Sequence, residues 1–323
     1  MIRRRVPRVL VAVIAGLLLL SLVGAVSQAV ATSRDRRTYP PPGKMINVDG
    51  HRLHLHCTGY GSPTVILEAG NLGMSGHWVR VQQEVARLTR VCSYDRAGMG
   101  WSEARPGSRD ASQISTELHS LLTGAGETGP YVLVGHSYGG LYALNYAGEY
   151  PGEVAGLVLL DSSHPDQFTR TPEGQAMFRR TTRLGAVLPW LARLGIVRLT
   201  HFLPAHPELP PQQRAEVAAF NSSTRQVATS AKEFRATPAT CNQARGTRSL
   251  GDKPLAVITA GDQPPDWLQM QNELAALSSN NIHRIAVGTT HASLVFSVRS
   301  AILSSAAIAQ VIMSVRIGQP LNH

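Results

Sequence analysis

Residues 131–140 read Tyr-Val-Leu-Val-Gly-His-Ser-Tyr-Gly-Gly, and this stretch decides the fold. Its first four residues are apolar, as in a short strand that is buried on both faces of a sheet. A Gly-His-Ser-Tyr-Gly turn follows, and residues 141–147 then contain good helix formers and no helix breaker. A strand, a G-x-S-x-G turn and a helix in this order form the context that a nucleophilic serine on a tight turn requires.

Ser137 stands at the centre of this turn. We predict that its backbone is strained and its side chain exposed, with Gly135 and Gly139 too close to neighbouring backbone to carry a Cβ. The turn also places Ser137 at a helix N-terminus, where the Tyr138 N–H is unpaired and can face a developing oxyanion. A chance match in a Gly-rich chain is the alternative, and the flanking strand and helix make it the poorer explanation.

The 323 residues can form one large α/β domain or two small ones. The net charge of +10 is concentrated in residues 1–44 and 162–252, and no stripe of arginines and aromatics crosses the rest of the chain. We therefore expect no nucleic-acid partner. Residues 124–129 match the dinucleotide pattern G-x-G-x-x-G, but they close a predicted helix and lead into a strand, so we interpret them as a loop and expect no cofactor.

Two histidines, His54 and His56, alternate with leucines and so share one face of a predicted strand. A metal site would need a third ligand that the sequence does not identify. We therefore interpret this face as solvated and expect no metal site.

The N-terminus has the composition of a signal or a membrane anchor. Arg3, Arg4, Arg5 and Arg8 precede an uncharged, mostly apolar run that ends at Ala31. The sequence Ala-Val-Ala at 29–31 favours signal cleavage, whereas the length of the run, close to the ~20 residues that span a bilayer, favours an uncleaved anchor. We expect a signal or anchor over residues 1–31 and a linker over residues 32–43. The body is then either membrane-anchored and extracytoplasmic, or secreted.

Strands and helices alternate from residue 64 to residue 161, and the alternation resumes at residue 254. This pattern predicts a mostly parallel sheet built from residues 44–161 and 253–323. The intervening residues 162–252 are too many for a plain loop, so we expect them to form a subdomain. The ligand crevice of such a sheet lies at the carboxyl ends of its strands.

A serine hydroxyl needs a base within hydrogen-bond reach, and the base needs an orienting acid. Of the twelve histidines, only His291 follows the end of a late predicted strand, so we predict that it is the base. Asp161 and Asp262 both follow strand ends, and we favour Asp161, with Asp262 as the alternative acid. The loop after residues 64–68 should supply the second oxyanion donor, the Asn71 N–H with its side chain as an additional candidate, beside the N–H of Tyr138.

These features together resemble the α/β-hydrolase superfamily, in its serine-nucleophile branch, over about residues 44–316. The motifs that carry the resemblance are Leu67-Glu68-Ala69-Gly70, Tyr94-Asp95-Arg96-Ala97-Gly98, Gly135-His136-Ser137-Tyr138-Gly139-Gly140, Leu160-Asp161 and Thr290-His291. The resemblance implies an eight-stranded, mostly parallel sheet with helices on both faces and a helical cap, residues 162–252, inserted after strand six. It also implies the chain order serine, acid, histidine.

The chain departs from many members of that superfamily at two places. Ala69-Gly70 stands where many have His-Gly, and Pro264 stands where many have an acid after strand seven. The second departure favours Asp161 over Asp262. The resemblance implies a serine hydrolase that acts on a small-molecule or lipid-like carboxylic ester, or on an amide or thioester. An acyltransferase with the same triad and a non-catalytic ligand-binding protein are the alternatives.

The resemblance also places Cys57 and Cys92 on neighbouring strands. Strands lie ~4.8 Å apart and a disulfide prefers a Cα separation of ~5.5–6 Å, so a bridge between them is permissible. An oxidising compartment would favour it, and two buried thiols are the alternative. If Cys57 and Cys92 are bridged, Cys241 is the free cysteine.

Overall fold

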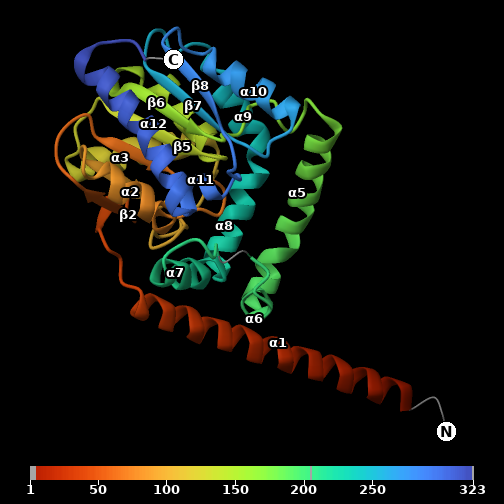
Figure 1. Cartoon of the computed structure of the whole chain (residues 1–323). Coiled ribbons are helices and arrows are strands. Elements are labelled where there is room, and N and C mark those ends of the chain that lie inside the picture. Colours follow the sequence, from red (N-terminus) through yellow and green to blue (C-terminus); the bar gives the residue numbers. More distant parts are fainter. Residues whose placement is uncertain (1–4, 204–205, 322–323) are drawn as a thin grey trace.

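A computed structural model describes residues 5–203 and 206–321 and shows an eight-stranded sheet in the order β1-β2-β4-β3-β5-β6-β7-β8 (Figure 1). Strand β2 is antiparallel to both of its neighbours, and all other pairs are parallel. The strands are β1 (Lys44–Val48), β2 (His51–Thr58), β3 (Val65–Glu68), β4 (Val91–Tyr94), β5 (Tyr131–His136), β6 (Val154–Leu160), β7 (Leu255–Ala260) and β8 (Asn281–Ala286). The predicted α/β class and mostly parallel eight-stranded sheet are confirmed.

Helices cover both faces of this sheet, and each face has its own buried apolar cluster. On one face lie α3 (Ala111–Ala125), α4 (Gly139–Glu149) and α10 (Pro265–Ala275). On the other face lie α2 (Val79–Val85), α11 (Ser293–Phe296) and α12 (Val298–Ile317). The 3-10 turn η2 (Ser75–Trp78) directly precedes α2 in the chain. The central strands are buried throughout, which explains their continuous apolar sequence.

Five helices lie between β6 and β7, within the insertion expected over residues 162–252. They are α5 (Pro172–Arg193), α6 (Ile196–Thr200), α7 (Pro211–Asn221), α8 (Thr224–Arg235) and α9 (Thr237–Arg245). Helix α8 packs along α5, and α9 packs on α4 of the core. We call this group the cap.

The N-terminal segment forms one long helix, α1 (Arg5–Thr38). It does not end at residue 31, so most of the expected linker 32–43 is helical, and the helix stops just before Pro40. Helix α1 is long and apolar enough to cross a membrane. A signal sequence meets the same criterion of length and hydropathy, and so does α12, half of which is buried inside the protein. Arg3 and Arg4 lie outside the described residues.

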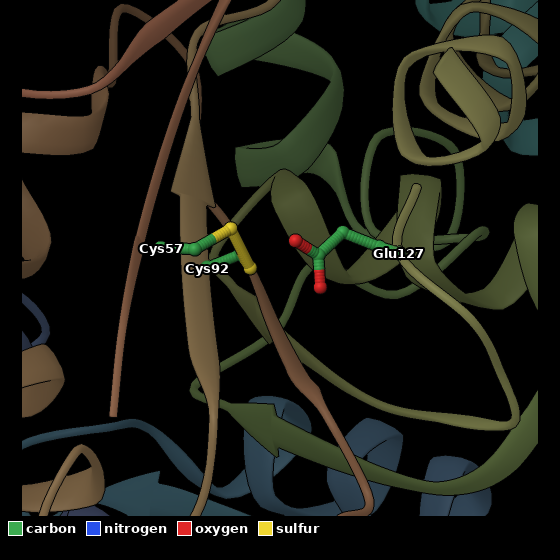
Figure 2. A group of neighbouring side chains, drawn as sticks. All are labelled: Cys57, Cys92 and Glu127. Carbon is green, nitrogen blue, oxygen red and sulfur yellow. A yellow bond between two sulfur atoms is a disulfide. The ribbon is translucent and has the colours of Figure 1, made fainter. Parts of the chain in front are cut away.

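Cys57 and Cys92 form a disulfide between β2 and β4, which decides between the bridge and the two buried thiols that the sequence analysis left open (Figure 2). The two residues are directly opposite in the antiparallel register, with Cα atoms 4.0 Å apart. Cys241 is free and buried. Glu127 lies near the two sulfurs. The disulfide leaves no thiolate to bind a metal there. The Glu127 carboxylate instead accepts two hydrogen bonds from Arg90, of 2.7 and 2.6 Å.

Removing the disulfide with Cys57→Ala/Cys92→Ala is expected to lower the free energy of unfolding by ~3–4 kcal/mol, because the bridge closes a loop over a sequence separation of 35 residues. Urea unfolding of oxidised and reduced protein measures the same difference without a change of side chain. The free cysteine provides the control, and Cys241→Ala should respond identically with and without reductant. Titration of three thiols in the denatured, unreduced protein would contradict the bridge.

Candidate active site

Ser137 occupies the turn between β5 and α4 in a left-handed conformation, with φ 56°. The glycines on either side permit this close turn. A Cβ on Gly135 would lie 2.6 Å from the Gly140 Cα, and a Cβ on Gly139 would lie 2.4 Å from the Glu68 carbonyl oxygen. Positive φ is costly for a serine. The turn therefore holds Ser137 in a strained conformation at the carboxyl end of the central strand.

Asp161 follows the end of β6 and is 0% exposed. Its Oδ2 lies 2.6 Å from His291 Nδ1, and its Oδ1 accepts hydrogen bonds from Trp267 Nε1 at 2.8 Å and from the Ala260 N–H at 3.3 Å. The Gln263 amide also donates to Oδ2. Burial alone would raise the pKa of Asp161, but the hydrogen bond and charge of His291, with the other donors, hold this pKa below its ordinary value.

The alternative acid, Asp262, is exposed on the turn after β7, and within the described part of the chain its carboxylate has no hydrogen-bond partner. Asp161 and not Asp262 therefore contacts His291. A carboxylate at Nδ1 favours the tautomer that carries its proton there, which leaves Nε2 able to accept another.

Ser137 and His291 line the same cavity, of about 190 Å³. Among the described residues no hydrogen bond joins the Ser137 hydroxyl to the His291 ring, as is common in active sites without a bound substrate. The cavity wall comes from the loop after β3, from η2, from α11 and from the cap. Its other residues are Ala69, Gly70, Asn71, Leu72, Gly73, His77, Trp78, His136, His206, Asn221, Ala292, Val295 and Phe296.

The loop after β3 and the turn after β5 meet at Ser137, and each brings one backbone amide with it, that of Asn71, which follows Gly70, and that of Tyr138, which follows Ser137. A Cβ on Gly70 would lie 3.0 Å from the Ser137 Cβ, so glycine lets the loop after β3 approach the serine. The N–H groups of Asn71 and Tyr138 have no acceptor among the described residues. The Asn71 side chain is engaged elsewhere, because it exchanges two hydrogen bonds with Ser230 of the cap. The backbone amides, and not this side chain, are thus available to an anionic oxygen.

A model of the family described as "alpha/beta hydrolase fold" matches residues 63–297, which is most of the chain. The chain belongs to the alpha/beta hydrolase fold family. Membership supports a hydrolase that acts on small molecules, as the resemblance implied.

This α/β hydrolase is similar to several known proteins. An uncharacterized protein of Schizosaccharomyces pombe, C23C11.06c, is 27% identical over 286 residues, covering 77% of this chain and 52% of the relative. Two further curated relatives are covered to only 39% and 53% of their length, so the match spans about half of these proteins or less.

Solved structures show the same fold at low identity. An esterase of Thermogutta terrifontis superposes with a TM-score of 0.62 at 21% identity, over 84% of this chain and 97% of that one. The epoxide hydrolase CorEH superposes with a TM-score of 0.65 at 20% identity, over 82% of this chain and 96% of that one. Because neighbours of such different chemistry share the fold, the reaction of this α/β hydrolase has to be argued from its own side chains.

One residue that the sequence analysis did not single out organises the site of this α/β hydrolase. Arg96 is buried and donates to the Ala69 and Gly70 carbonyl oxygens at 2.6 and 2.9 Å, which holds the loop after β3 in place beside Ser137. The same guanidinium pairs with Glu68 of β3 at 2.7 Å and with Glu233 of the cap at 2.9 Å. Burial raises the pKa of Glu68 to about 7, against the opposing charge of Arg96. Arg96 therefore joins the sheet, the loop after β3 and the cap.

Three other histidines of the cavity wall were also not predicted. Burial and the neighbouring His206 lower the pKa of His77 to about 3, and burial and His291 lower that of His136 to about 3. The His136 Nε2–H donates to the His291 carbonyl oxygen at 3.0 Å. These rings are neutral and pack with Phe296, so they line the cavity as aromatic surface and do not act as general bases. The position of His136 inside the G-x-S-x-G motif was the available signal.

The prediction that this face of β2 is solvated is wrong for His54, which is fully buried. Its Nδ1 lies 3.0 Å from Asp95 Oδ2, and its ring packs on Trp101. The segment after β4 folds over this face of the strand, and Asp95 accepts from the Ser75 N–H at 2.7 Å at the start of η2. The His54–Asp95 pair therefore holds the start of η2, whose His77 and Trp78 form part of the cavity wall.

Replacing Arg96 with glutamine is expected to cost ~3–5 kcal/mol of unfolding free energy, because Glu68 and Glu233 would remain buried without their partner. Turnover should fall as well, since the Ala69 and Gly70 carbonyl groups lose their donor. Urea unfolding together with an assay of hydrolase turnover measures both. Arg52→Gln, which breaks an exposed pair with Glu103, is the control and should change the stability far less, because solvent screens an exposed ion pair. Equal costs for the two variants would refute the role of Arg96.

Proposed function

We propose that this α/β hydrolase is a serine hydrolase that cleaves a carboxylic ester through an acyl-serine intermediate. The observation that carries the proposal is the 2.6 Å contact between Asp161 and His291, in one cavity with a serine in a left-handed turn. A buried carboxylate, an imidazole and a strained serine in this chain order are the requirements of nucleophilic acyl transfer. A serine at this position does not fit the carboxylate-nucleophile chemistry by which epoxides and haloalkanes are opened.

In this mechanism the Ser137 hydroxyl attacks the ester carbonyl while His291 Nε2 takes its proton. Asp161 holds the imidazole tautomer and stabilises the imidazolium that forms. The Asn71 and Tyr138 N–H groups bind the oxyanion, and each such donor contributes ~10²–10³ to turnover. His291 then protonates the leaving alcohol, and water, activated by the same ring, releases the acid from Ser137.

Acyl transfer to an alcohol is the second candidate, since it uses the same residues and differs only in the acceptor. The cavity wall of Trp78, Phe296 and neutral histidine rings favours an apolar acyl group and supports either reaction. A non-catalytic ligand-binding protein would need neither the Asp161–His291 contact nor free oxyanion amides.

We further propose that α1 anchors the protein in a membrane with the catalytic body outside the cytoplasm. Its exposed apolar side chains and the disulfide, which an oxidising compartment favours, support this location. The alternative is a cleaved signal and a secreted body. Carbonate extraction of membranes, followed by intact-mass measurement, separates the two.

Labelling with a fluorophosphonate probe tests the enzyme proposal directly. The folded protein should be labelled at Ser137, identified by peptide mass, and labelling should stop after heat denaturation. A series of p-nitrophenyl esters of increasing acyl length then defines the substrate, and added alcohol acceptors distinguish transfer from hydrolysis. A folded sample that takes up no label and cleaves no ester would leave the binding-protein alternative.

A further inference from the structure

Helix α1 is fastened to the cap along one face of its C-terminal half. A Cβ on Gly24 would lie 2.5 Å from the Leu194 carbonyl oxygen at the end of α5. Gln28 is 3% exposed, donates to a backbone carbonyl after α7 at 2.8 Å and accepts from Arg198 at 3.1 Å. Arg198 also pairs with Asp35 at 2.7 Å. Figure 1 shows α1 passing α7 and α6 in this way and then continuing beyond the body.

Beside these contacts, α1 and the cap enclose an open groove that contains four guanidinium groups. Arg36 and Arg37 come from α1, and Arg193 and Arg225 come from the cap. No acidic residue lines the groove, and within residues 5–203 and 206–321 none of the four pairs with a carboxylate. Arg225 has a buried Nε without a hydrogen-bond partner in that part of the chain, and burial with the charge of Arg36 lowers its pKa to about 10. Arg225 also donates to the Gly100 carbonyl oxygen, and the more distant carboxylates of Asp95 and Glu103 act on its charge. The groove is thus positive, and no carboxylate lines it.

The arginines of the groove lie where the apolar surface of α1 ends. The uncharged run from Val9 to Ala31 is about 35 Å long at 1.5 Å per residue, enough to cross the ~30 Å hydrocarbon core of a bilayer. The groove extends from Ala25 to Arg37, so it overlaps the end of this run, and Arg36 and Arg37 lie just beyond it. The neighbouring corner of the cap exposes Trp190 and Leu199, the latter to 79%, as expected of side chains at a membrane interface.

We propose that this groove binds the phosphate group of an anionic lipid in the leaflet next to the cap. Guanidinium forks match phosphate oxygens in geometry and charge. The lipid's acyl chains would lie along the exposed apolar side chains of α1, which a soluble phosphate ester could not use. The site also gives a role to the arginines at this end of α1, since the positive-inside rule accounts only for those at the other end. The inference rests on the proposed anchoring by α1 and on none of the catalytic residues.

The test uses the full chain in nonionic detergent, with its intact mass showing that α1 is retained. Native mass spectrometry measures binding of phosphatidylglycerol, phosphatidylcholine and inorganic phosphate. Phosphatidylglycerol should bind at least about tenfold more tightly than phosphatidylcholine, and Arg36→Gln/Arg193→Gln should weaken its binding by about tenfold or more. Arg179→Gln/Arg180→Gln removes two exposed arginines of α5 outside the groove and should leave the affinity unchanged.

Equal weakening by both double substitutions would mean diffuse attraction to positive charge and would overturn the site. Displacement of phosphatidylglycerol by inorganic phosphate at low millimolar concentration would overturn the lipid assignment in favour of a soluble anion. An intact mass without α1 would overturn both the site and the lipid assignment, because Arg36 and Arg37 would be missing. Fluorophosphonate labelling of Ser137 in the same samples reports on catalysis separately. Labelled protein that binds no lipid refutes this inference alone, and unlabelled protein that binds lipid refutes the proposed reaction alone.

Discussion

Replacing Ser137 with alanine is expected to lower kcat for ester hydrolysis by about 10⁶-fold and to abolish fluorophosphonate labelling, because no other nucleophile takes the place of its hydroxyl. His291→Ala should have a similar effect. The two losses should not multiply in the double variant, since the serine and its base act as one unit and the oxyanion amides of Asn71 and Tyr138 remain. Single-turnover and steady-state assays of the three variants measure this.

A matched control is Ser249→Ala, which changes an exposed serine outside the cavity and should keep wild-type turnover. Ser137→Ala should also unfold at or above the wild-type midpoint, since it changes only a side chain at a strained position. Activity above about one per cent of wild type in Ser137→Ala, or multiplicative losses in the double variant, would contradict a serine nucleophile.

The left-handed turn at Ser137 and the crowding at Gly135 could be predicted because their causes act within ten residues. A strand that enters a tight turn and leaves as a helix brings Gly135 against the backbone of Gly140, whereas Gly139 is crowded by the Glu68 carbonyl oxygen, which is close because β3 pairs with β5. The placement of Asp161 and His291 at one edge follows from parallel strands, whose carboxyl ends share an edge. Both predictions needed only chain direction and local sterics.

The Arg96 network could not be predicted in the same way. Arg96 and Glu233 are 137 positions apart, and their pairing depends on how the cap sits over the sheet, which no periodicity reports. The burial of His54 likewise depends on the segment that covers its strand. In both cases a polar residue is satisfied by a partner from another part of the fold.

Helix α1 runs past residue 31, where the expected anchor ends and the expected linker begins. Hydropathy changes near residue 31, and the expected boundary followed that change. Helix propensity does not change there, and the helix continues through polar residues to Thr38, until Pro40 removes a backbone donor. Hydropathy reports which solvent a segment prefers, whereas the backbone responds to propensity and to the contacts that Gln28 and Asp35 make with the cap.

Replacing Asp161 with asparagine is expected to lower kcat by about 10⁴-fold while the protein stays folded, because an amide at Nδ1 favours the wrong imidazole tautomer. The backbone should tolerate the change, since Asp161 has φ 43° and asparagine adopts this region as readily as aspartate. Trp267 Nε1 and the Ala260 N–H can still donate to the remaining amide oxygen. Turnover and thermal unfolding, measured together, separate a lost tautomer from a lost fold.

Asp262→Asn provides the matched comparison, with the same chemical change on the next strand end. Its exposed carboxylate has no hydrogen-bond or ion-pair partner in the described part of the chain, so kcat should stay within about twofold of wild type. An acid on the loop after β7 would have to reach the Nδ1 that Asp161 already occupies at 2.6 Å. If Asp262→Asn were the inactive variant and Asp161→Asn the active one, the orienting acid would be Asp262, and the strand-six assignment would have to be abandoned.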